Sequence, residues 1–295
     1  MTMVEPGPRS AVDTEETIVR LEGRIRSYGA PTAMVAFSGG VDSATVLALA
    51  ARTLGPAAVI AVTAVSPSYP EGELDAARGV AAGLKVEHVV VTTREIEREA
   101  YARNDGERCF HCKTELYATI HRLAAGLPRG VAVMAGANAD DATDFRPGLR
   151  AGRERGIHNP LLEESLGKPA VRAVARALRL TVADKPALAC LSSRVAFGVR
   201  ITPELLSRID RAEGAVRAMG FEQVRVRHLG RTASIEVAPP EVPALLDHPE
   251  RRALEDELRA MGWTSIEVDP LGYRSGSMNA TLIPLQAVPS GSTRP

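Results

Sequence analysis

The sequence has little of the features that mark several large classes of protein. Of its 295 residues, 36 are Lys or Arg and 36 are Asp or Glu, so the formal net charge is zero. Chains that act on nucleic acid usually carry a basic excess, so that class is disfavoured, although a local basic patch is still compatible with the composition. Only three cysteines are present, which argues against a disulfide framework and for a cytoplasmic protein.

Signals for secretion and for membrane insertion are also missing. The first ten residues, MTMVEPGPRS, contain no basic segment followed by an apolar core, so we expect no signal peptide. The most apolar span, residues 44–65, is interrupted by Arg52, Gly55 and Pro56, so we expect no membrane span there. The chain also shows no internal repeat and no low-complexity run.

Apolar runs alternate with amphipathic segments in the first two thirds of the chain. Buried strands are predicted at 32–37, 57–65, 85–92 and 130–138, and helices at 13–29, 41–55, 71–84, 112–127 and 168–180. Near-continuous apolar strands between helices indicate an α/β fold with a parallel sheet that is covered on both faces.

The last third of the chain follows a different pattern. It predicts a helix at 203–219, strands at 222–228 and 233–238, a helix at 241–261 and a strand at 264–268. We therefore predict two domains, an α/β domain at 13–198 and a small α+β domain at 199–282, the second for substrate binding or oligomerisation.

The segment SGGVDS, residues 38–43, interrupts the chain between the first predicted strand and the next helix. Backbone N–H groups of Gly39, Gly40 and Val41 can point into one concavity, and the helix that starts at about Asp42 adds its positive end. This arrangement suits a phosphate or pyrophosphate at the carboxyl end of a parallel strand. The P-loop pattern GxxxxGK[ST] is absent, so the loop has no lysine for a γ-phosphate. The alternative is a tight turn capped by serine.

This loop resembles the pyrophosphate-binding loop of the ATP pyrophosphatase (PP-loop) superfamily. Those enzymes split ATP into AMP and pyrophosphate and adenylylate a carboxylate, amide or keto oxygen. The resemblance implies an adenine nucleotide alpha hydrolase-like fold with the end of the second strand near the adenine or ribose. The residues that we expect to bind ATP are Ala36, Ser38, Gly39, Gly40, Asp42, Ser43, Thr63, Gly136, Asp141 and Arg146.

An acidic loop, residues 136–151, follows the fourth predicted strand. Asn138, Asp140, Asp141, Asp144 and Arg146 lie within nine positions of one another. Clustered carboxylates at the end of a strand suit Mg²⁺, which prefers oxygen ligands and shares them with phosphates. We therefore expect Asp141 to help to bind a divalent cation, with a solvated polar loop as the alternative.

The three cysteines form a pair and a single residue. Cys109 and Cys112 lie just before a predicted helix, and this spacing places two sulfurs within chelating distance for a metal or cluster. His111 or His121 could complete a zinc site. The alternative is three unrelated buried thiols.

Cys190 lies in the polar segment CLSSR. Arg194 follows it within four residues and could lower the pKa of the thiol, which would favour the nucleophilic thiolate. A structural cysteine beside a turn is the alternative.

The small domain contributes a basic pair. Arg225 and Arg227 lie two apart on one predicted strand, so their side chains share a face and suit a substrate phosphate or carboxylate, together with Arg194. Glu213 and Glu236 are candidates either to bind a divalent cation or to orient the arginines. An exposed strand face of charges is the alternative.

Six motifs, of which five lie outside the ATP loop, carry a closer resemblance. In order, they are AFSGGVDS, RCFHCK, GANADDATDFRPGLRA, PALACLSSR, VRVRHLGRTASIEV and GYRSGSMN, over about residues 15–280. They resemble the LarE family, the sulfur transferases of nickel-pincer nucleotide synthesis. The resemblance implies an enzyme that adenylylates the carboxylates of pyridinium-3,5-biscarboxylic acid mononucleotide, releases AMP and pyrophosphate, and forms thiocarboxylates for the cofactor used, for example, by lactate racemase.

The family offers two sources of sulfur. In members with one cysteine, the position that matches Cys190 gives up its own sulfur by β-elimination and ends as dehydroalanine. Members with three cysteines resemble cluster proteins, in which Cys109, Cys112 and Cys190 would hold a [4Fe–4S] cluster whose open iron carries a sulfide. For that role the three thiols should converge at the α-phosphate end of the ATP site.

The expected cofactors are ATP, Mg²⁺ and a [4Fe–4S] cluster. We expect a homo-oligomer that works with LarB-like and LarC-like enzymes and binds neither nucleic acid nor membrane. Two other functions are kept open: another PP-loop enzyme, such as an amide ligase or tRNA thiolase, and a non-catalytic Fe–S or zinc protein that binds nucleotide.

Overall fold

The computed structural model describes residues 14–128, 130–142, 147–186 and 189–274. The chain divides into two compact units, and each is described by itself. The first unit contains residues 1–64, 72–92 and 113–187, and the second contains 65–71, 93–112 and 188–295. This division by contacts assigns two short inner segments to the second unit. The sequence-based domain limits, 13–198 and 199–282, stay a prediction.

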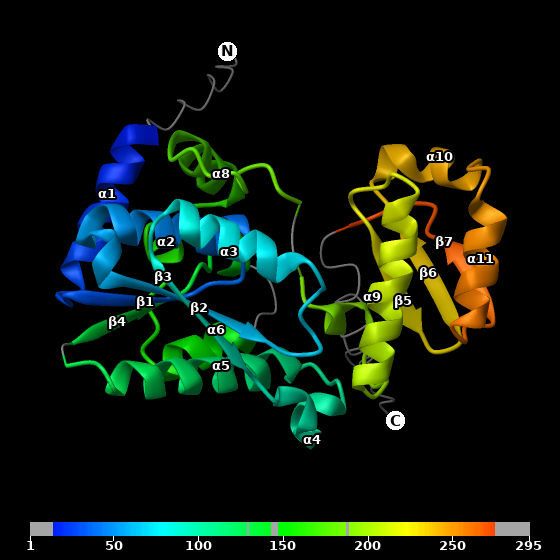
Figure 1. The fold of residues 1–295 in the computed structure, drawn as a ribbon, viewed down its shortest axis with the longest axis horizontal. Coiled ribbons are helices and arrows are strands. Elements are labelled where there is room, and N and C mark those ends of the chain that lie inside the picture. Colours follow the sequence, from blue (N-terminus) through cyan, green and yellow to red (C-terminus); the bar gives the residue numbers. More distant parts are fainter. Residues whose placement is uncertain (1–13, 129, 143–146, 187–188, 275–295) are drawn as a thin grey trace, which may run out of the picture. The chain divides into compact units, whose positions relative to one another are not determined.

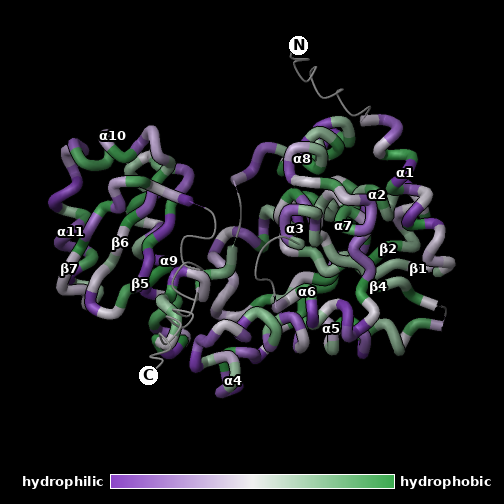
Figure 2. Tube along the Cα trace, turned by 180° about the vertical axis from the view of Figure 1, so that it is seen from behind, coloured by the Kyte–Doolittle hydropathy of each residue, from purple (hydrophilic) through white to green (hydrophobic). Residues whose placement is uncertain are grey.

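The first unit is built on a four-stranded sheet. Its strands are β1 (Thr32–Ala36), β2 (Val59–Val65), β3 (Glu87–Thr92) and β4 (Val131–Met134), in the order β3-β2-β1-β4. β1 pairs in parallel with both of its neighbours, and Val35 lies opposite Ala61 on β2 and Met134 on β4. β1, β2 and β4 are mostly apolar in sequence, and Figure 2 shows them in the hydrophobic colour.

Helices cover both faces of this sheet (Figure 1). Ala33 and Val35 pack on one face in a core shared with α1 (Thr14–Ser27), α2 (Val41–Leu54), α3 (Glu73–Gly83), α7 (Pro160–Glu163) and α8 (Lys168–Ala177). Met34 and Ala36 point to the other face, where α5 (Arg108–Ala125) packs and where α6 (Pro147–Glu154) also lies. Alternate residues of one strand thus enter two cores, as a sheet buried on both sides requires. The predicted α/β fold is confirmed.

The second unit has a three-stranded sheet and its own core. β5 (Arg225–Leu229) and β6 (Thr232–Glu236) are antiparallel, and β7 (Ser265–Val268) adds to β6 in parallel. The helices are α4 (Glu99–Ala102), α9 (Pro203–Ala218), α10 (Val242–Leu246) and α11 (Arg251–Ala260). Leu206, Ile235 and Leu258 meet in the core, while α11 is largely hydrophilic in Figure 2.

Two predicted helix limits are wrong. The single helix expected at 241–261 is two helices, α10 and α11, because Pro249 lies between them. Proline lacks an N–H group, and its ring disfavours the helical conformation of the residue before it. The helix expected to start at Cys112 starts at Arg108, after the Asp105 carboxylate accepts a 2.9 Å hydrogen bond from the N–H of Glu107.

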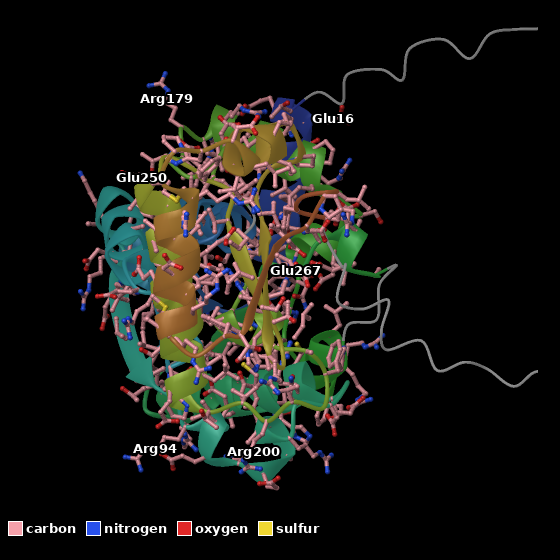
Figure 3. All side chains as sticks on the ribbon, turned by 90° about the vertical axis from the view of Figure 1, so that its right-hand side faces the viewer. Glu16, Arg94, Arg179, Arg200, Glu250 and Glu267 are labelled. Carbon is pink, nitrogen blue, oxygen red and sulfur yellow. The ribbon has the colours of Figure 1, made fainter. Side chains whose placement is uncertain are left out.

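Charged side chains of both signs project from the surface, among them Arg94, Arg179, Arg200 and Glu250 (Figure 3). Over the described ranges, none of the helices combines the length and the apolar character that a membrane crossing requires.

Trp263, the only tryptophan of the chain, is buried in the second unit. Its indole N–H donates a 2.9 Å hydrogen bond to Nδ1 of His228. Because the indole is a donor only, this bond requires an unprotonated Nδ1. Burial and, after it, the positive charge of Arg208 lower the pKa of His228. The neutral imidazole is therefore the form that the folded unit accommodates.

We predict that His228 makes the second unit sensitive to acid. In the unfolded chain His228 takes up a proton near pH 6.5, and in the folded chain it does so only at lower pH. Between these values the unfolded state binds more protons, so the free energy of unfolding falls as the pH is lowered. His228→Gln keeps a side-chain oxygen as acceptor but does not titrate, so it should flatten this dependence.

The measurement is urea unfolding followed by the fluorescence of Trp263 at several pH values below about 7. His121→Gln, an exposed position in the first unit, serves as the control and should leave the pH dependence unchanged. An unchanged slope in His228→Gln would contradict the prediction.

Candidate functional site

The loop between β1 and α2 is closed by hydrogen bonds of Ser43. Its hydroxyl lies 3.2 Å from the Ser38 hydroxyl, accepts a 3.2 Å bond from the Ser38 N–H, and donates to the Gly40 carbonyl at 3.1 Å. Gly39 has φ +78°, a left-handed conformation that favours glycine, and a Cβ there would lie 3.2 Å from Cβ of Ala77. The loop is therefore held in one shape by its own small residues.

The helix that follows begins without a side-chain cap. Gly40 is the N-cap residue of α2, and glycine has no side chain that could accept a hydrogen bond from the first turn. The N–H groups of that turn have no partners within the helix, and they lie at its positive end. A 14-residue helix with this start is suited to bind an anion such as pyrophosphate.

Gly136, just beyond β4, lies directly against the start of α2. A Cβ at this position would be 2.6 Å from the backbone nitrogen of Ser43 and 2.8 Å from the carbonyl carbon of Asp42. Real side chains do not approach a backbone so closely, so only glycine fits. Two loops that are far apart in the sequence are thereby packed backbone to backbone.

A polar network joins this point to α8. The Asn138 amide donates to the Asp42 carboxylate at 3.3 Å, and the Lys168 ammonium forms an ion pair with the same carboxylate. Asp140 accepts the N–H of Lys168 at 2.8 Å, and Asp141 accepts the N–H of Asn138 at 3.0 Å. In the described part of the acidic loop, the carboxylates of Asp140 and Asp141 therefore bind backbone N–H groups, one within the loop and one at Lys168.

The ATP loop itself has no lysine, and no motif in the sequence points to Lys168. The structure supplies one from α8, 126 positions after Asp42 in the chain. A signal was present, because Lys168 is the first residue of its helix, where the macrodipole disfavours a cation. Such a position calls for an anionic neighbour.

Of the other residues expected to bind ATP, Ala36 and Thr63 are described, and both are buried. Ala36 is buried at the end of β1. Thr63 is also buried, and its hydroxyl donates to the Phe37 carbonyl at 2.7 Å while lying 2.8 Å from Nε2 of His88. The hydroxyl proton of Thr63 is thus used in a hydrogen bond to the backbone that follows β1. Arg146, like Asp144, lies outside the described residues.

The cysteines all belong to the second unit. Cys109 and Cys112 occupy the first turn of α5, three positions apart and so on one side of the helix, and Cys109 is exposed. Cys190 is half-buried and directly precedes a 3₁₀ turn at Leu191–Arg194. None of the three forms a disulfide.

The loop of Cys190 is held to Ser68 by a backbone hydrogen bond. The N–H of Leu191 donates to the carbonyl of Ser68 at 2.8 Å. Ser68 is in turn fixed by its hydroxyl, which donates to the buried carboxylate of Glu95 at 3.2 Å. This contact was not predicted, because Glu95 and Ser68 carry no motif.

A buried tyrosine and a buried arginine are close to the thiols. Burial raises the pKa of Tyr101, and negative charge on Cys190 and then on Cys112 raises it further. Burial lowers the pKa of Arg108, but the charges of Cys190, Cys109 and Tyr101 and a hydrogen bond to Cys109 more than offset it. The charge of each of the three cysteines therefore raises the pKa of Tyr101, of Arg108 or of both.

No group of three His, Cys, Asp or Glu side chains in the described ranges is arranged so that it could hold a metal ion. Within the second unit, Cys109, Cys112 and Cys190 share surroundings but are not gathered as a ligand set. The side chains as placed therefore do not form a cluster site, and the predicted ligand roles stay predictions.

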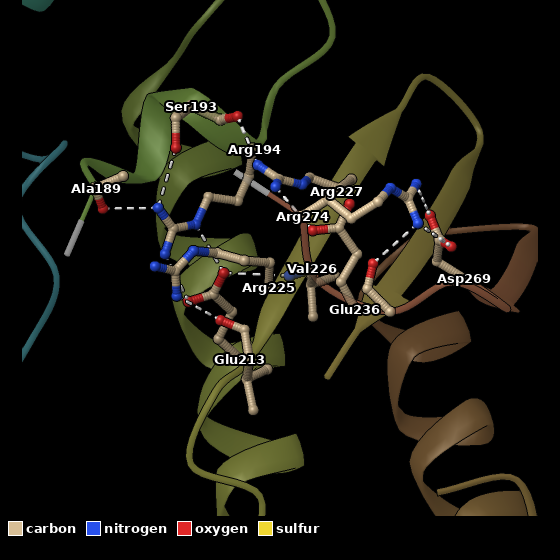
Figure 4. Close-up of polar contacts among 12 residues, drawn as sticks. Ala189, Ser193, Arg194, Glu213, Arg225, Val226, Arg227, Glu236, Asp269 and Arg274 are labelled. Carbon is tan, nitrogen blue, oxygen red and sulfur yellow. Dashed lines mark hydrogen bonds and ion pairs between the residues drawn. The ribbon is translucent and has the colours of Figure 1, made fainter. Parts of the chain in front are cut away.

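Arg194 does not have the surroundings expected of it. It is 1% exposed, and it binds Glu213 with two hydrogen bonds of 2.8 and 3.1 Å (Figure 4). A third nitrogen donates to the carbonyls of Ala189 and Cys190 at 2.6 and 3.0 Å. Its observed role is to hold the backbone of the cysteine loop, and no contact with the Cys190 thiol is seen.

Arg225 and Arg227 are buried, so they are not an exposed strand face of charges. Arg227 donates to Glu236 at 2.7 Å and to the Ser193 carbonyl at 3.0 Å (Figure 4). Arg225 donates to the Val224 carbonyl at 2.7 Å and lies over the ring of Tyr273. The pKa of Arg225 is lowered to about 10, first by burial and then by the charge of Arg194.

Glu213 and Glu236 are both engaged with arginines. Glu213 also accepts from Arg217 at 2.7 Å and from the N–H of Val226 at 3.1 Å. Burial alone would raise the pKa of Glu213, but Arg194 and the other arginines lower it overall. Both carboxylates thus form ion pairs with the arginines, and the two predicted roles of Glu213 and Glu236 stay predictions.

Comparison with known proteins gives both a family model and relatives. A model described as NAD synthase matches residues 14–118. An uncharacterized protein of Synechocystis sp. is 40% identical over 250 residues, 85% of this chain and 92% of its own. Pyridinium-3,5-bisthiocarboxylic acid mononucleotide synthase of Lactiplantibacillus plantarum is 33% identical over 252 residues, 85% of this chain and 90% of its own. An uncharacterized protein of Methanocaldococcus jannaschii is 27% identical over 204 residues, 69% and 77% of the two chains.

We predict that Gly136→Ala weakens ATP binding at least tenfold. This magnitude is what we expect when a binding group is displaced by about 1 Å. The added methyl group would push against the backbone of Asp42 and Ser43, so the start of α2 must move. The measurement is calorimetric titration with ATP, with thermal unfolding to verify that the variant is folded.

Gly79→Ala is the matched control. Gly79 lies in α3 of the same unit with nothing within 4 Å of an added Cβ, so this change should leave ATP binding intact and stabilise the helix by up to about 1 kcal/mol. Equal affinities of the two variants for ATP would show that the approach of Gly136 does not shape the site.

Proposed function

Because the chain belongs to the family of pyridinium-3,5-bisthiocarboxylic acid mononucleotide synthase, the LarE family, we propose that it is an ATP-dependent sulfurtransferase of nickel-pincer nucleotide synthesis. Its substrate is proposed to be pyridinium-3,5-biscarboxylic acid mononucleotide. Each cycle converts one carboxylate to a thiocarboxylate and releases AMP and pyrophosphate.

One observation carries this proposal, the 33% identity with the synthase over 252 residues. That length exceeds either unit of the chain, so the likeness extends over parts of both units and includes the segments with the arginines and cysteines. The match to the NAD synthase model, in contrast, ends at residue 118 and supports only the ATP-binding half.

The ATP half of the proposal rests on the first unit. The Ser38–Ser43 loop and the uncapped start of α2 are proposed to hold the pyrophosphate end, with Lys168 as an additional cation. A substrate carboxylate oxygen then attacks the α-phosphorus, and the bond to the β-phosphate oxygen breaks. Mg²⁺ would enter with ATP, and Asp141 is the proposed protein ligand. The product, an acyl adenylate, has the leaving group that a carboxylate lacks.

The acceptor half rests on the arginines of the second unit. Arg194, Arg225 and Arg227 are buried with two carboxylates, those of Glu213 and Glu236. The lowered pKa of Arg225 means that its positive charge is disfavoured in the absence of a ligand. A bound phosphate or carboxylate would reverse this, so we propose that Arg225 and Arg227 bind the acceptor nucleotide and that Arg194 supports them.

The sulfur step requires a thiolate that attacks the acyl carbon and displaces AMP. If Cys190 is the donor, the intermediate is a thioester to Cys190, formed as the bond to AMP breaks. Removal of the Cys190 α-proton then cleaves the Cβ–S bond, which leaves the thiocarboxylate and dehydroalanine. No external oxidant or reductant is needed, but each chain transfers sulfur only once.

A [4Fe–4S] cluster held by Cys109, Cys112 and Cys190, with a sulfide on the open iron, is the alternative source, and it would allow repeated turnover. Three thiols in one protein favour it, although they are not gathered as a ligand set. The location of the cysteines near the α-phosphate, a homo-oligomeric state, a cytoplasmic location and LarB-like and LarC-like partner enzymes are part of the same proposal.

The central test is anaerobic incubation with ATP and the biscarboxylate nucleotide, followed by mass spectrometry of product and protein. We expect AMP, pyrophosphate and a thiocarboxylate product. Cys190→Ala should abolish the thiocarboxylate but leave AMP formation in place, because the thiol acts only after adenylylation. Absence of AMP formation with this acceptor, together with activity on an amide or tRNA acceptor, would refute the proposal in favour of another PP-loop enzyme.

Cys109→Ala separates the two sulfur sources. With a cluster as source, this variant should lose sulfur transfer, while wild type supplied with sulfide should turn over repeatedly. With Cys190 as source, the variant should transfer once and Cys190 should become lighter by one H₂S. The second result would exclude the cluster.

The arginines are tested by ligand affinity. Arg225→Gln and Arg227→Gln should each weaken the pyridinium nucleotide at least tenfold, as expected for loss of a charged hydrogen bond, and leave ATP affinity nearly unchanged. Arg211→Gln, an exposed position on α9, is the control and should change neither affinity. Equal weakening of both ligands in calorimetric titrations would place these arginines outside the acceptor site.

A further inference from the structure

Arg108, the first residue of α5, is a buried cation whose hydrogen-bond acceptors are mostly neutral. It is 6% exposed. One of its nitrogens donates to the Asn104 side-chain oxygen and, at 2.8 Å, to the Ser192 carbonyl, and its guanidinium lies 5.7 Å from the centre of the Phe197 ring. A buried guanidinium is costly unless anionic charge is near it.

An ionised thiol can supply such charge, and Arg108 is close in the chain or in the fold to two of them: it precedes Cys109, and it binds the carbonyl of Ser192, two residues after Cys190. The ionised forms of Cys190 and Cys109 are the two strongest attractive influences on Arg108, ahead of Tyr101. Cys109 is the next residue along the chain, whereas Cys190 is brought near by the fold. Arg108 is thus positioned between the two parts of the chain that carry the cysteines.

The same two parts are joined by further buried hydrogen bonds. Asn104, in a left-handed conformation with φ +56°, donates from its amide to the carbonyls of Val195, Ala196 and Val199. The Tyr101 hydroxyl lies 2.7 Å from the Ser192 hydroxyl. This set of contacts, which we call the Asn104 clamp, fixes the Cys190 loop against the start of α5, and Arg108 donates to both sides of it.

We propose that Arg108 is the positioning residue of the cysteine site, whose guanidinium ties the Cys190 loop to the start of α5 and presents its positive charge to the sulfur atoms of Cys109 and Cys190. The inference deepens the proposed sulfur transfer and rests on it for its biological meaning. In either sulfur source the reacting species is anionic, a thiolate or a sulfide, and a fixed cation beside it keeps such a species in place.

The proposal distinguishes a charge role from a packing role. Arg108→Lys keeps the charge but cannot donate in the same fork, whereas Arg108→Gln keeps polar donors and loses the charge. Arg103→Gln is the matched control, because Arg103 lies on the same segment, is exposed and pairs with Asp105 at its surface.

The test compares two alkylating reagents on the reduced full-length protein without ATP or acceptor. Iodoacetate is anionic and iodoacetamide is neutral, and both react with the thiolate, so the ratio of their rates cancels the thiolate fraction and reports the local charge. Rates at Cys109 and Cys190 are obtained by peptide mass spectrometry.

We expect the iodoacetate-to-iodoacetamide ratio to fall about fivefold at both cysteines in Arg108→Gln, as for loss of a unit charge a few ångströms away at a partly solvated site. The ratio should be mostly kept in Arg108→Lys and unchanged in Arg103→Gln. Higher salt should lower the ratio in wild type, which tests the charge even if Arg108→Gln does not fold.

Equal ratios in wild type and Arg108→Gln, or the same fall in the Lys and Gln variants, would overturn the proposal, as would a wild-type ratio that does not respond to salt. Because the assay uses neither ATP nor acceptor, a failure of the proposed sulfur transfer would leave this result standing. If Arg108→Gln gives a normal thiocarboxylate yield and the wild-type iodoacetate-to-iodoacetamide ratio, the role of Arg108 is refuted and the proposed sulfur transfer is not.

Discussion

The second unit depends on the buried ion pair between Arg194 and Glu213. Arg194 holds the backbone of the Cys190 loop, and Glu213 holds α9 to the first residues of β5 through the N–H of Val226. Removing one partner of such a pair leaves an uncompensated charge in the core, which costs about 3–5 kcal/mol. The loop with the proposed nucleophile and the strand with the proposed acceptor-binding arginines are therefore positioned by the same two side chains.

In the first unit, the site is shaped instead by the close packing of two backbone segments. The left-handed turn at Gly39 and the contact of Gly136 with Ser43 leave no room for side chains beside the start of α2. The anion-binding groups there are peptide N–H groups, whose positions follow from the path of the chain. A site of this kind needs few charged residues, and in keeping with that, Lys168 is the one cation in the described part of its polar network.

Much of the fold could be predicted because its causes are local. Nearly continuous apolar strands such as 59–65 can be recognised from the sequence alone, as can helices with apolar residues three and four apart, such as Ile18, Leu21 and Ile25. The start of α5 was misplaced because its polar first turn, which carries Cys109 and Cys112, has no apolar periodicity. The break between α10 and α11 had a signal in the sequence, Pro249, which the apolar periodicity of 241–261 does not reveal.

The motifs of the site were visible in the sequence, but the partners of their residues were not. Arg194 lies four positions from Cys190, which suggested a direct effect on the thiol, yet the fold pairs it with Glu213 on α9. Lys168 and Asp42 are 126 positions apart, so no spacing rule relates them. Such contacts arise from tertiary packing, and single-sequence patterns contain little information about it.

The surplus of buried guanidinium groups over carboxylates in the second unit has a consequence for its tolerance of salts. In the described part of the unit, four arginines are buried (Arg108, Arg194, Arg225 and Arg227) with three glutamates (Glu95, Glu213 and Glu236), and the pKa of Arg225 is already lowered. Repulsion between buried positive charges lowers the stability of the folded state. Proteins keep such charges where activity needs them, at the expense of stability. The unit should therefore be an anion-dependent fold, more resistant to heat in sulfate or phosphate buffer than in chloride of equal ionic strength.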